Sequence, residues 1–198
     1  MSRRHTVVTI ASAAAIAAAL PAVKAYEGLW LVAKVDTIGT GRPVTACYGE
    51  TENVRLGERF TKQECDDLLT VKLKRYDAEI GRCIHVDLPD RTRAAMVSFS
   101  YNVGSAGACR SSTIRLMNEG KIRQGCEALM QWTRAQGHVV QGLVNRRAKE
   151  RALCLAGLND MRRQDPSACS RGPGDNTPLG AGCHAREIAP PTKRSWHR

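Results

Sequence analysis

Two carboxylates and a hydroxyl near the start of the chain have the types and spacing of an acid/base site. Glu27 stands at the end of an apolar segment, and Asp36 and Thr45 follow it within one helix and one turn. Two carboxyl groups that flank a bond, one protonated and one ionised, are the usual equipment for cleaving a glycosidic linkage. We therefore take these three as candidate catalytic residues. Their plain alternatives are a solvated glutamate, a helix-ending aspartate and a strand threonine.

The elements that must position these residues are one helix and a small, turn-rich sheet. The pattern from Ala22 to Val35 is compatible with a helix. Gly39, Gly41 and Pro43 then predict turns before a short strand at residues 44–48. The two later candidate residues would thus lie on either side of one turn-rich connection.

A helical half follows the sheet. The capping box Thr61–Glu64 opens a helix with one apolar face, which stops at Gly81. Further helices are predicted at residues 91–101, from Ser111 or Ser112 to Gly120, from Ile122 to Gly137, and after Gly142. The pattern indicates an α+β fold that is mainly helical, with a small antiparallel sheet lobe and a helical lobe.

The last predicted helix has an amphipathic pattern that assigns its faces. Arg146 and Arg147 are expected on the solvated face, together with Lys149 and Arg151. The residues expected to face inward are Val144, Ala148, Ala152 and Leu155. Beyond Leu158 the apolar period stops, and residues 159–198 are rich in proline and glycine, which is typical of a flexible tail.

Charge and cysteine content favour an exported protein with a polyanionic partner. The formal net charge of +11 suits nucleic acid, anionic lipid or a cell-wall polymer without choosing among them. Eight cysteines without a Cys-x-x-Cys pair favour disulfides over a metal site, and hence an oxidising compartment. We expect no metal and no cofactor. Eight cysteines allow about 105 pairings, so the connectivity stays open.

The N-terminus has the order of an export signal. The basic stretch Arg3–His5 precedes an uncharged, alanine-rich run from Thr6 to Val23, which is only just long enough to span a membrane. Cleavage after Ala25 would leave Glu27 on the frayed end of the mature chain. An uncleaved, weak anchor is therefore favoured over a cleaved signal peptide.

Six motifs follow one another in order along the chain. They are Tyr26-Glu27-Gly28, Asp36, Thr45 to Gly49, Phe99 to Gly104, Cys109 to Thr113, and Gly142 to Arg147. Together they resemble the bacteriophage-type lysozymes (endolysins, muramidases) of glycoside hydrolase family 24, and the resemblance runs from about Tyr26 to Leu158. The N-terminus resembles the signal-anchor-release segments of some endolysins, in which a weak anchor holds the inactive enzyme on the inner membrane before release into the periplasm.

The resemblance implies a lysozyme-like fold with the active-site cleft between the two lobes. The implied reaction is hydrolysis of the β-1,4 bond between N-acetylmuramic acid and N-acetylglucosamine in peptidoglycan, with inversion at the anomeric carbon. Glu27 would be the general acid, Asp36 would stay ionised and help to orient water, and Thr45 would hold that water. Asn102 and Arg110 would contact the saccharide, although Asn102 could equally cap a helix.

The sequence departs from the family pattern at two places. Gly41–Arg42–Pro43 looks like an insertion in the catalytic hairpin, which leaves Thr37 and Thr40 as alternatives to Thr45. Glu50 stands where the family often has histidine. This carboxylate could disturb the titration of the site or simply point to solvent.

The sequence thus predicts a signal-anchor at residues 1–25, a lysozyme-like catalytic domain at 26–158 and a basic tail at 159–198. The expected partners are peptidoglycan and, through the N-terminal segment, the inner membrane. We expect a monomeric endolysin that is first membrane-tethered, then periplasmic, and that lyses the host cell. Two rival functions stay open, a lytic transglycosylase and a non-catalytic cationic wall-binding protein. Nucleic-acid binding is not supported, because no helix-turn-helix, zinc or RNA-binding motif appears.

Overall fold

In the computed structural model, which describes residues 12–36 and 41–164, Glu27 is the last residue of the first helix, α1 (Ala13–Glu27). Ser12 caps this helix, because its hydroxyl accepts a hydrogen bond from the backbone N–H of Ala15. Gly28 ends it with a φ of 66°, a left-handed conformation that glycine adopts without a Cβ clash. The stripe that α1 buries, mainly against the helix α3 (Asp90–Val103), consists of Ala15, Ile16, Ala19 and Val23.

Helix α1 contains residues 13–23 of the uncharged run, 6–23, for which a membrane anchor is predicted. Residues 6–11 of that run lie outside the described residues. Along the described chain, no helix combines the length and the apolar character needed to cross a membrane. The anchor therefore stays a prediction.

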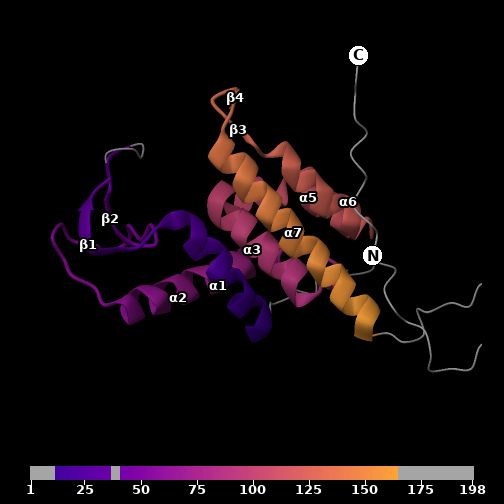
Figure 1. Cartoon of the computed structure of the whole chain (residues 1–198), viewed down its shortest axis with the longest axis horizontal. Helices are drawn as coiled ribbons and strands as arrows, with labels where there is room; N and C mark the ends of the chain where they lie inside the picture. The colour runs from indigo at the N-terminus through magenta and orange to yellow at the C-terminus, as the bar shows by residue number, and fades with distance from the viewer. Residues whose placement is uncertain (1–11, 37–40, 165–198) are drawn as a thin grey trace, which may run out of the picture. The chain divides into compact units, whose positions relative to one another are not determined.

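The stretch after α1 is a strand, so the prediction of a helix up to Val35 is wrong. Strand β1 (Trp30–Val35) pairs antiparallel with β2 (Val44–Cys47), and its other edge is hydrogen-bonded to residues 57–60 (Figure 1). Gly28 interrupts the helix, and backbone partners on both edges then favour the extended chain. The hairpin supplies the small antiparallel sheet that the sequence predicts.

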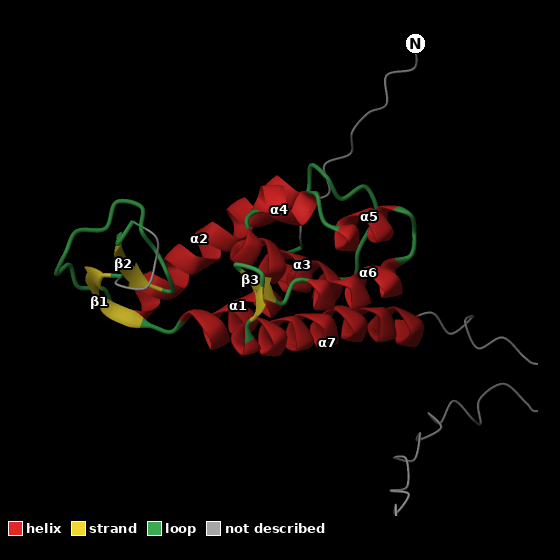
Figure 2. Cartoon of the chain, turned by 90° about the horizontal axis from the view of Figure 1, so that it is seen from above, coloured by secondary structure: helices red, strands yellow, loops and turns green. Residues whose placement is uncertain are grey.

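The predicted capping box is present at the start of α2 (Lys62–Ile80). The Thr61 hydroxyl accepts a hydrogen bond from the Glu64 N–H, and the Glu64 carboxylate accepts one from the Thr61 N–H at 2.7 Å. Figure 2 shows α2 extending from the hairpin toward the other helices. A buried ion pair joins α2 to α3, because Arg93 Nε lies 2.5 Å from Asp77 Oδ1.

Three short helices follow α3, namely α4 (Ser105–Cys109), α5 (Ser112–Asn118) and α6 (Ile122–Ala128). Ser111 is the N-cap of α5, since its hydroxyl accepts a hydrogen bond from the Ile114 N–H at 3.2 Å. This confirms the first of the two capping residues that the sequence offers.

The helix predicted to run to Gly137 ends earlier. A short 3-10 turn, η1 (Leu129–Gln131), follows α6, and a two-stranded hairpin of β3 (Arg134–Ala135) and β4 (His138–Val139) takes the place of the last helical turns. Gln136 and Gly137 both have positive φ, which reverses the chain between the two strands.

The last helix, α7 (Gln141–Gln164), is rotated about its axis relative to the prediction. Arg146 and Arg147, which we expected in solvent, have exposed fractions of only 5% and 0%. Ala148 and Ala152, expected to face inward, are exposed. The arginines turn inward because Glu150, also buried, supplies a carboxylate for both of them.

Three disulfides join elements that are distant in the sequence. They are Cys47–Cys65 between β2 and α2, Cys83–Cys109 between the end of α2 and α4, and Cys126–Cys154 between α6 and α7. For these six residues the preference for disulfides is confirmed. Cys169 and Cys183 lie outside the described residues.

The contact between α7 and α3 depends on a residue without a side chain. A Cβ added at Gly157 would lie 2.7 Å from the Thr92 backbone nitrogen and 2.5 Å from Thr92 Oγ1. That hydroxyl is held in place, since it donates to the Cys154 carbonyl at 2.9 Å. We predict that Gly157→Ala lowers the free energy of unfolding by about 1–3 kcal/mol, measured by chemical denaturation.

The matched control is Gly142→Ala in the same helix. A Cβ added there meets no atom within 4 Å, so the change should be neutral or raise the free energy of unfolding by up to about 1 kcal/mol. Equal stabilities for the two variants would contradict the close approach of α7 to α3.

Candidate active site

Glu27 is held by a buried guanidinium. Arg146 Nη1 of α7 lies 2.7 Å from Glu27 Oε1, and the exposed fractions of the two side chains are 6% and 24%. The end of α1 is therefore bound to α7, with one carboxylate oxygen engaged by the arginine. Glu27 is thus a partly exposed carboxylate with a defined orientation rather than a freely solvated one.

Arg146 is itself positioned by two further buried contacts. Its Nε donates to Glu150 Oε1 at 3.1 Å and its Nη2 to the Ser98 carbonyl of α3 at 3.3 Å. Glu150 also accepts hydrogen bonds from Arg147 at 2.5 Å and from the Ser98 hydroxyl at 2.8 Å. Burial raises the pKa of Glu150, and burial also lowers the pKa of Arg147. The two arginines and Glu150 form a network that was not foreseen, although their spacing of three and four residues on α7 could have indicated it.

Asn102, one of the two predicted saccharide-binding residues, is attached to this network. Its side-chain oxygen accepts a hydrogen bond from Arg147 Nη2. The Arg147 guanidinium also lies 5.0 Å from the centre of the Phe99 ring, a cation–π contact that places it beneath α3. Asn102 is exposed at the end of α3, and its role in binding the saccharide stays a prediction.

Arg110, the other predicted saccharide-binding residue, is placed elsewhere. It is the C-cap residue of α4, its side chain is exposed, and its backbone N–H donates to the Ala106 carbonyl at 3.3 Å. Among the described residues, no hydrogen bond or ion pair joins Arg110 to Glu27, Asp36, Thr45 or Asn102. Its role therefore stays a prediction.

Thr45 and Asp36 lie on the two sides of the β1–β2 hairpin. Thr45 lies opposite Lys34 in the β1–β2 register, and the Asp36 N–H donates to the Pro43 carbonyl at 2.8 Å. Since side chains alternate along a strand, Asp36 follows Lys34 on the same face as Thr45. Thr45 Oγ1 is buried and has no hydrogen-bond partner in the described part of the chain, which is unusual for a buried hydroxyl.

The two alternatives to Thr45, Thr37 and Thr40, lie outside the described residues. Asp36 makes further interactions of its own. The inserted turn is described at Gly41 and Arg42, which both have positive φ and lead into β2.

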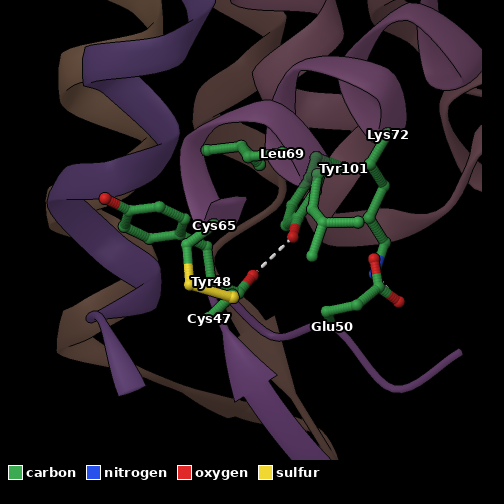
Figure 3. Close-up of a pocket in the computed structure, with 8 residues that line it drawn as sticks. Cys47, Tyr48, Glu50, Cys65, Leu69, Lys72 and Tyr101 are labelled. Atoms are coloured by element: carbon green, nitrogen blue, oxygen red, sulfur yellow. Dashed lines mark hydrogen bonds and ion pairs between the residues drawn. A yellow bond between two sulfur atoms is a disulfide. The ribbon is translucent and has the colours of Figure 1, made fainter. Parts of the chain in front are cut away.

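The turn after β2, residues Cys47 to Glu50, lies against the candidate acid. A Cβ added at Gly49 would be 3.9 Å from Glu27 Oε2 and 3.9 Å from the Tyr101 hydroxyl. That hydroxyl, from α3, donates to the Tyr48 carbonyl at 2.6 Å (Figure 3). Burial raises the pKa of Tyr101, which therefore remains a neutral donor at physiological pH.

The Glu50 side chain does not point freely to solvent. Its Oε1 accepts the backbone N–H groups of Thr51 and Glu52 at 2.8 and 2.9 Å and lies 3.4 Å from Lys72 Nζ. Both side chains of this pair are largely buried, with exposed fractions of 13% and 14%. The prediction that Glu50 points to solvent is therefore wrong, because this carboxylate holds the turn. Its effect on the titration of Glu27 stays a prediction, although burial, and with it the charge of Glu50, raises the pKa of Tyr101.

A second cluster attaches α1 to the same turn from the other side. Lys24 Nζ of α1 lies 2.7 Å from Asp66 Oδ1 of α2, and the Tyr48 hydroxyl donates to the same oxygen at 2.9 Å. The disulfide Cys47–Cys65 occupies the neighbouring positions on β2 and α2. Hydrogen bonds from Lys24, Lys62 and Tyr48 lower the pKa of Asp66 far below its ordinary value.

No group of three or more histidine, cysteine, aspartate or glutamate side chains in the described ranges is arranged to hold a metal ion.

Comparison with known proteins places this geometry in a family. The family model described as phage lysozyme matches residues 24–150. The chain is 38% identical over 132 residues to a SAR-endolysin of Enterobacteria phage PA-2, a match that covers 66% of this chain and 78% of that protein. It is 34% identical over 161 residues to a SAR-endolysin of Bacteriophage PS34, covering 78% and 95%.

Solved structures agree with this result. The lysozyme of phage P22 has a TM-score of 0.64 at 26% identity and covers 74% of this chain and 99% of its own. The active form of the P1 phage endolysin Lyz has a TM-score of 0.64 at 26% identity, covering 71% and 84%. The predicted lysozyme-like α+β fold is confirmed.

The lowered pKa of Asp66 yields a prediction about stability in acid. An aspartate whose pKa is lower in the folded than in the unfolded state stabilises the fold above the unfolded pKa of about 4. We predict that Asp66→Asn lowers the free energy of unfolding at pH 7. The difference from the natural chain should shrink below about pH 4 and vanish as the pH falls through the folded pKa, in urea denaturation at several pH values.

Asp67→Asn is the control, because the neighbouring Asp67 is exposed and its side chain, in the described ranges, accepts a hydrogen bond from Gln63 of the same helix. Its stability should follow that of the natural chain at every pH. A pH-independent loss in Asp66→Asn would show that packing rather than the ion pairs is disturbed.

Proposed function

Since the chain belongs to the phage lysozyme family, we propose that its reaction is hydrolysis of the β-1,4 bond between N-acetylmuramic acid and N-acetylglucosamine. The protein is an endolysin, a lysozyme-type glycoside hydrolase that degrades peptidoglycan and lyses the host cell. The observation that carries the proposed reaction is the placement of the Glu27 carboxyl, held by Arg146 at the end of α1 and bordered by the turn at Gly49.

Glu27 is proposed as the general acid. The acid must deliver a proton to the leaving glycosidic oxygen, so it needs one oxygen free toward the saccharide and a fixed orientation. Arg146 engages Oε1, while Oε2 faces the turn. With its α1 helix packed into the core, the carboxyl is presented from a rigid element rather than from a mobile end.

Asp36 and Thr45 are proposed to handle the attacking water. As charge develops on the sugar, an ionised Asp36 would stabilise it, and the Thr45 hydroxyl would hold the water on the opposite face of the ring. Their common face on the hairpin and the unpaired Thr45 hydroxyl support this assignment. An inverting reaction of this kind requires carboxyl groups separated by roughly 6.5–9.5 Å in the substrate complex. Asn102 and Arg110 are proposed to contact the saccharide from the helical lobe.

We predict that Glu27→Gln lowers kcat on purified peptidoglycan by about 10²- to 10⁴-fold, because the amide cannot donate a catalytic proton. Turbidity clearance measures the rate, and circular dichroism checks the fold. Glu119→Gln, which changes an exposed glutamate of the helical lobe, should retain full activity. Full lytic activity of Glu27→Gln would instead favour the non-catalytic cationic protein.

The products distinguish hydrolysis from its closest enzymatic rival. Hydrolysis adds one water and leaves a reducing N-acetylmuramic acid end, whereas a lytic transglycosylase leaves an anhydro end that is lighter by one water. Mass spectrometry of the digest should show reducing ends only. Anhydro ends would overturn the proposed role of Asp36 and Thr45.

The N-terminal 25 residues are proposed to act as a signal-anchor that is not cleaved, with the protein first tethered to the inner membrane and then released to the periplasm. The names of the relatives, SAR-endolysins, support this. In the folded domain the apolar stripe of α1 is packed on α3, so it cannot face lipid at the same time. A molecule whose α1 segment lies in the membrane would thus lack the folded site around Glu27, and a molecule with that site would not be tethered.

Fractionation of cells that express the chain tests the anchor. We predict membrane-bound and periplasmic pools of the same mass, each retaining residues 1–25, with lytic activity in the released pool. A chain that begins at Tyr26 in the periplasm would mean a cleaved signal peptide. A folded, active enzyme in the membrane pool would contradict the exclusion of the two states.

A further inference from the structure

We infer that Lys72 is a positioning residue for the glycosidase reaction. It acts through the turn of residues 47–50, which it holds against the Glu27 carboxyl. This inference rests on the proposed function of Glu27 and adds a residue from α2 that the six sequence motifs do not include.

The turn receives side-chain contacts from the helices at three successive residues. The Tyr48 carbonyl accepts from the Tyr101 hydroxyl at 2.6 Å, and the Gly49 carbonyl accepts from Lys72 Nζ at 3.2 Å. The Glu50 carboxylate then pairs with the same ammonium at 3.4 Å. Figure 3 shows Lys72 and Tyr101 converging on the turn, beside the disulfide that fixes its first residue.

The chemistry of an ammonium suits this task. The Gly49 carbonyl and the Glu50 carboxylate are both acceptors, and Lys72 offers three donors from one charged centre, so it can serve both at once. Because the pair is largely buried, its attraction is screened less than that of a surface ion pair. The aliphatic part of Lys72 lines, with Leu68 and Leu69, a cavity of about 10 Å³ under the turn, enough for a single water.

Displacement of the turn would reach the acid directly. The Cα of Gly49 faces both Glu27 Oε2 and the Tyr101 hydroxyl, since a Cβ there would lie 3.9 Å from each. The positive φ of Gly49, 82°, allows this approach of backbone to carboxyl without a side chain. The Gly49 peptide therefore forms part of the wall beside the acid.

The same displacement would reach the candidate water-binding hydroxyl. Ala46 and Glu50 exchange two backbone hydrogen bonds, at 2.9 and 2.8 Å, and Ala46 follows Thr45 in β2. A movement of the Glu50 backbone would therefore also move Ala46 of β2, because the two residues are directly hydrogen-bonded. Lys72 accordingly sets the distance between Thr45 on β2 and the Glu27 carboxyl on α1. A shift of about 1 Å between catalytic groups can lower the rate of an enzyme by about 100-fold.

We therefore expect Lys72→Met to lower kcat by about 10- to 100-fold while KM for a soluble glycan fragment of peptidoglycan changes by less than about threefold. Lys72→Arg, which keeps the charge and the donors, should recover most of the rate. Kinetics are measured at a temperature at which denaturation curves show each variant to be fully folded. A role in stability alone would lower the melting temperature and leave kcat of the folded enzyme unchanged.

Two further variants make the result decisive. Lys74→Met removes an exposed lysine two residues along α2 and should leave kcat unchanged. Glu50→Gln keeps the volume of its side chain but weakens the pair, so it should lower kcat in the same direction. The double variant Lys72→Met/Glu50→Gln should then be no worse than the more affected single variant.

The inference and the proposed function can fail separately. If Glu27→Gln is inactive but folded Lys72→Met and Glu50→Gln both keep the natural kcat, Lys72 has no positioning role and the acid assignment stands. If Glu27→Gln remains active, the proposed catalytic role of Glu27 is wrong, and the inference about Lys72 is wrong with it. Should Lys72→Met not fold, Glu50→Gln and Lys72→Arg decide the question. A natural kcat in folded Glu50→Gln, or a kcat in folded Lys72→Arg that is lowered about 10-fold or more, would overturn the positioning role.

Discussion

The buried guanidinium of Arg146 is the contact on which the arrangement of the site depends. It joins the end of α1, the middle of α3 and α7, through Glu27, the Ser98 carbonyl and Glu150. Such a charge is costly to bury unless each donor is satisfied, so these partners must be present together for the core to close. The same requirement makes the orientation of Glu27 a consequence of helix packing and not of local sequence.

The sheet lobe is attached to the helices by a complementary set of contacts, most of them from α2. The disulfide Cys47–Cys65, the hydrogen bond from the Tyr48 hydroxyl to Asp66 and the pair of Lys72 with Glu50 all join α2 to the turn at the end of β2. A two-stranded hairpin alone would be marginal in water. Its attachment to a long, capped helix gives the candidate active site two walls that are fixed to one another, which the proposed catalysis requires.

The features of the fold that could be predicted from the sequence are those that depend on interactions between neighbouring residues. The capping box at Thr61, the end of α2 at Gly81 and the serine cap of α5 were predicted because each depends on a few adjacent residues. The strand β1 was missed because its apolar pattern suits a helix and only its partners on both edges select the extended form. The orientation of α7 was missed because alanine and arginine were assigned by polarity, while Glu150 reversed the preference.

The sequence by itself determined the helical class of the fold, the presence of disulfides and the identity of the candidate catalytic residues. These depend on the order of motifs and on residue types, which can be read without a structure. The tertiary structure alone decided which cysteines pair, that Arg146 is buried on Glu27, and that Glu50 supports a turn through Lys72. The physical reason is that the energy of a buried charge or of a shared hydrogen bond depends on which groups surround it. Those neighbours come from helices far apart in the chain, and only packing brings them together.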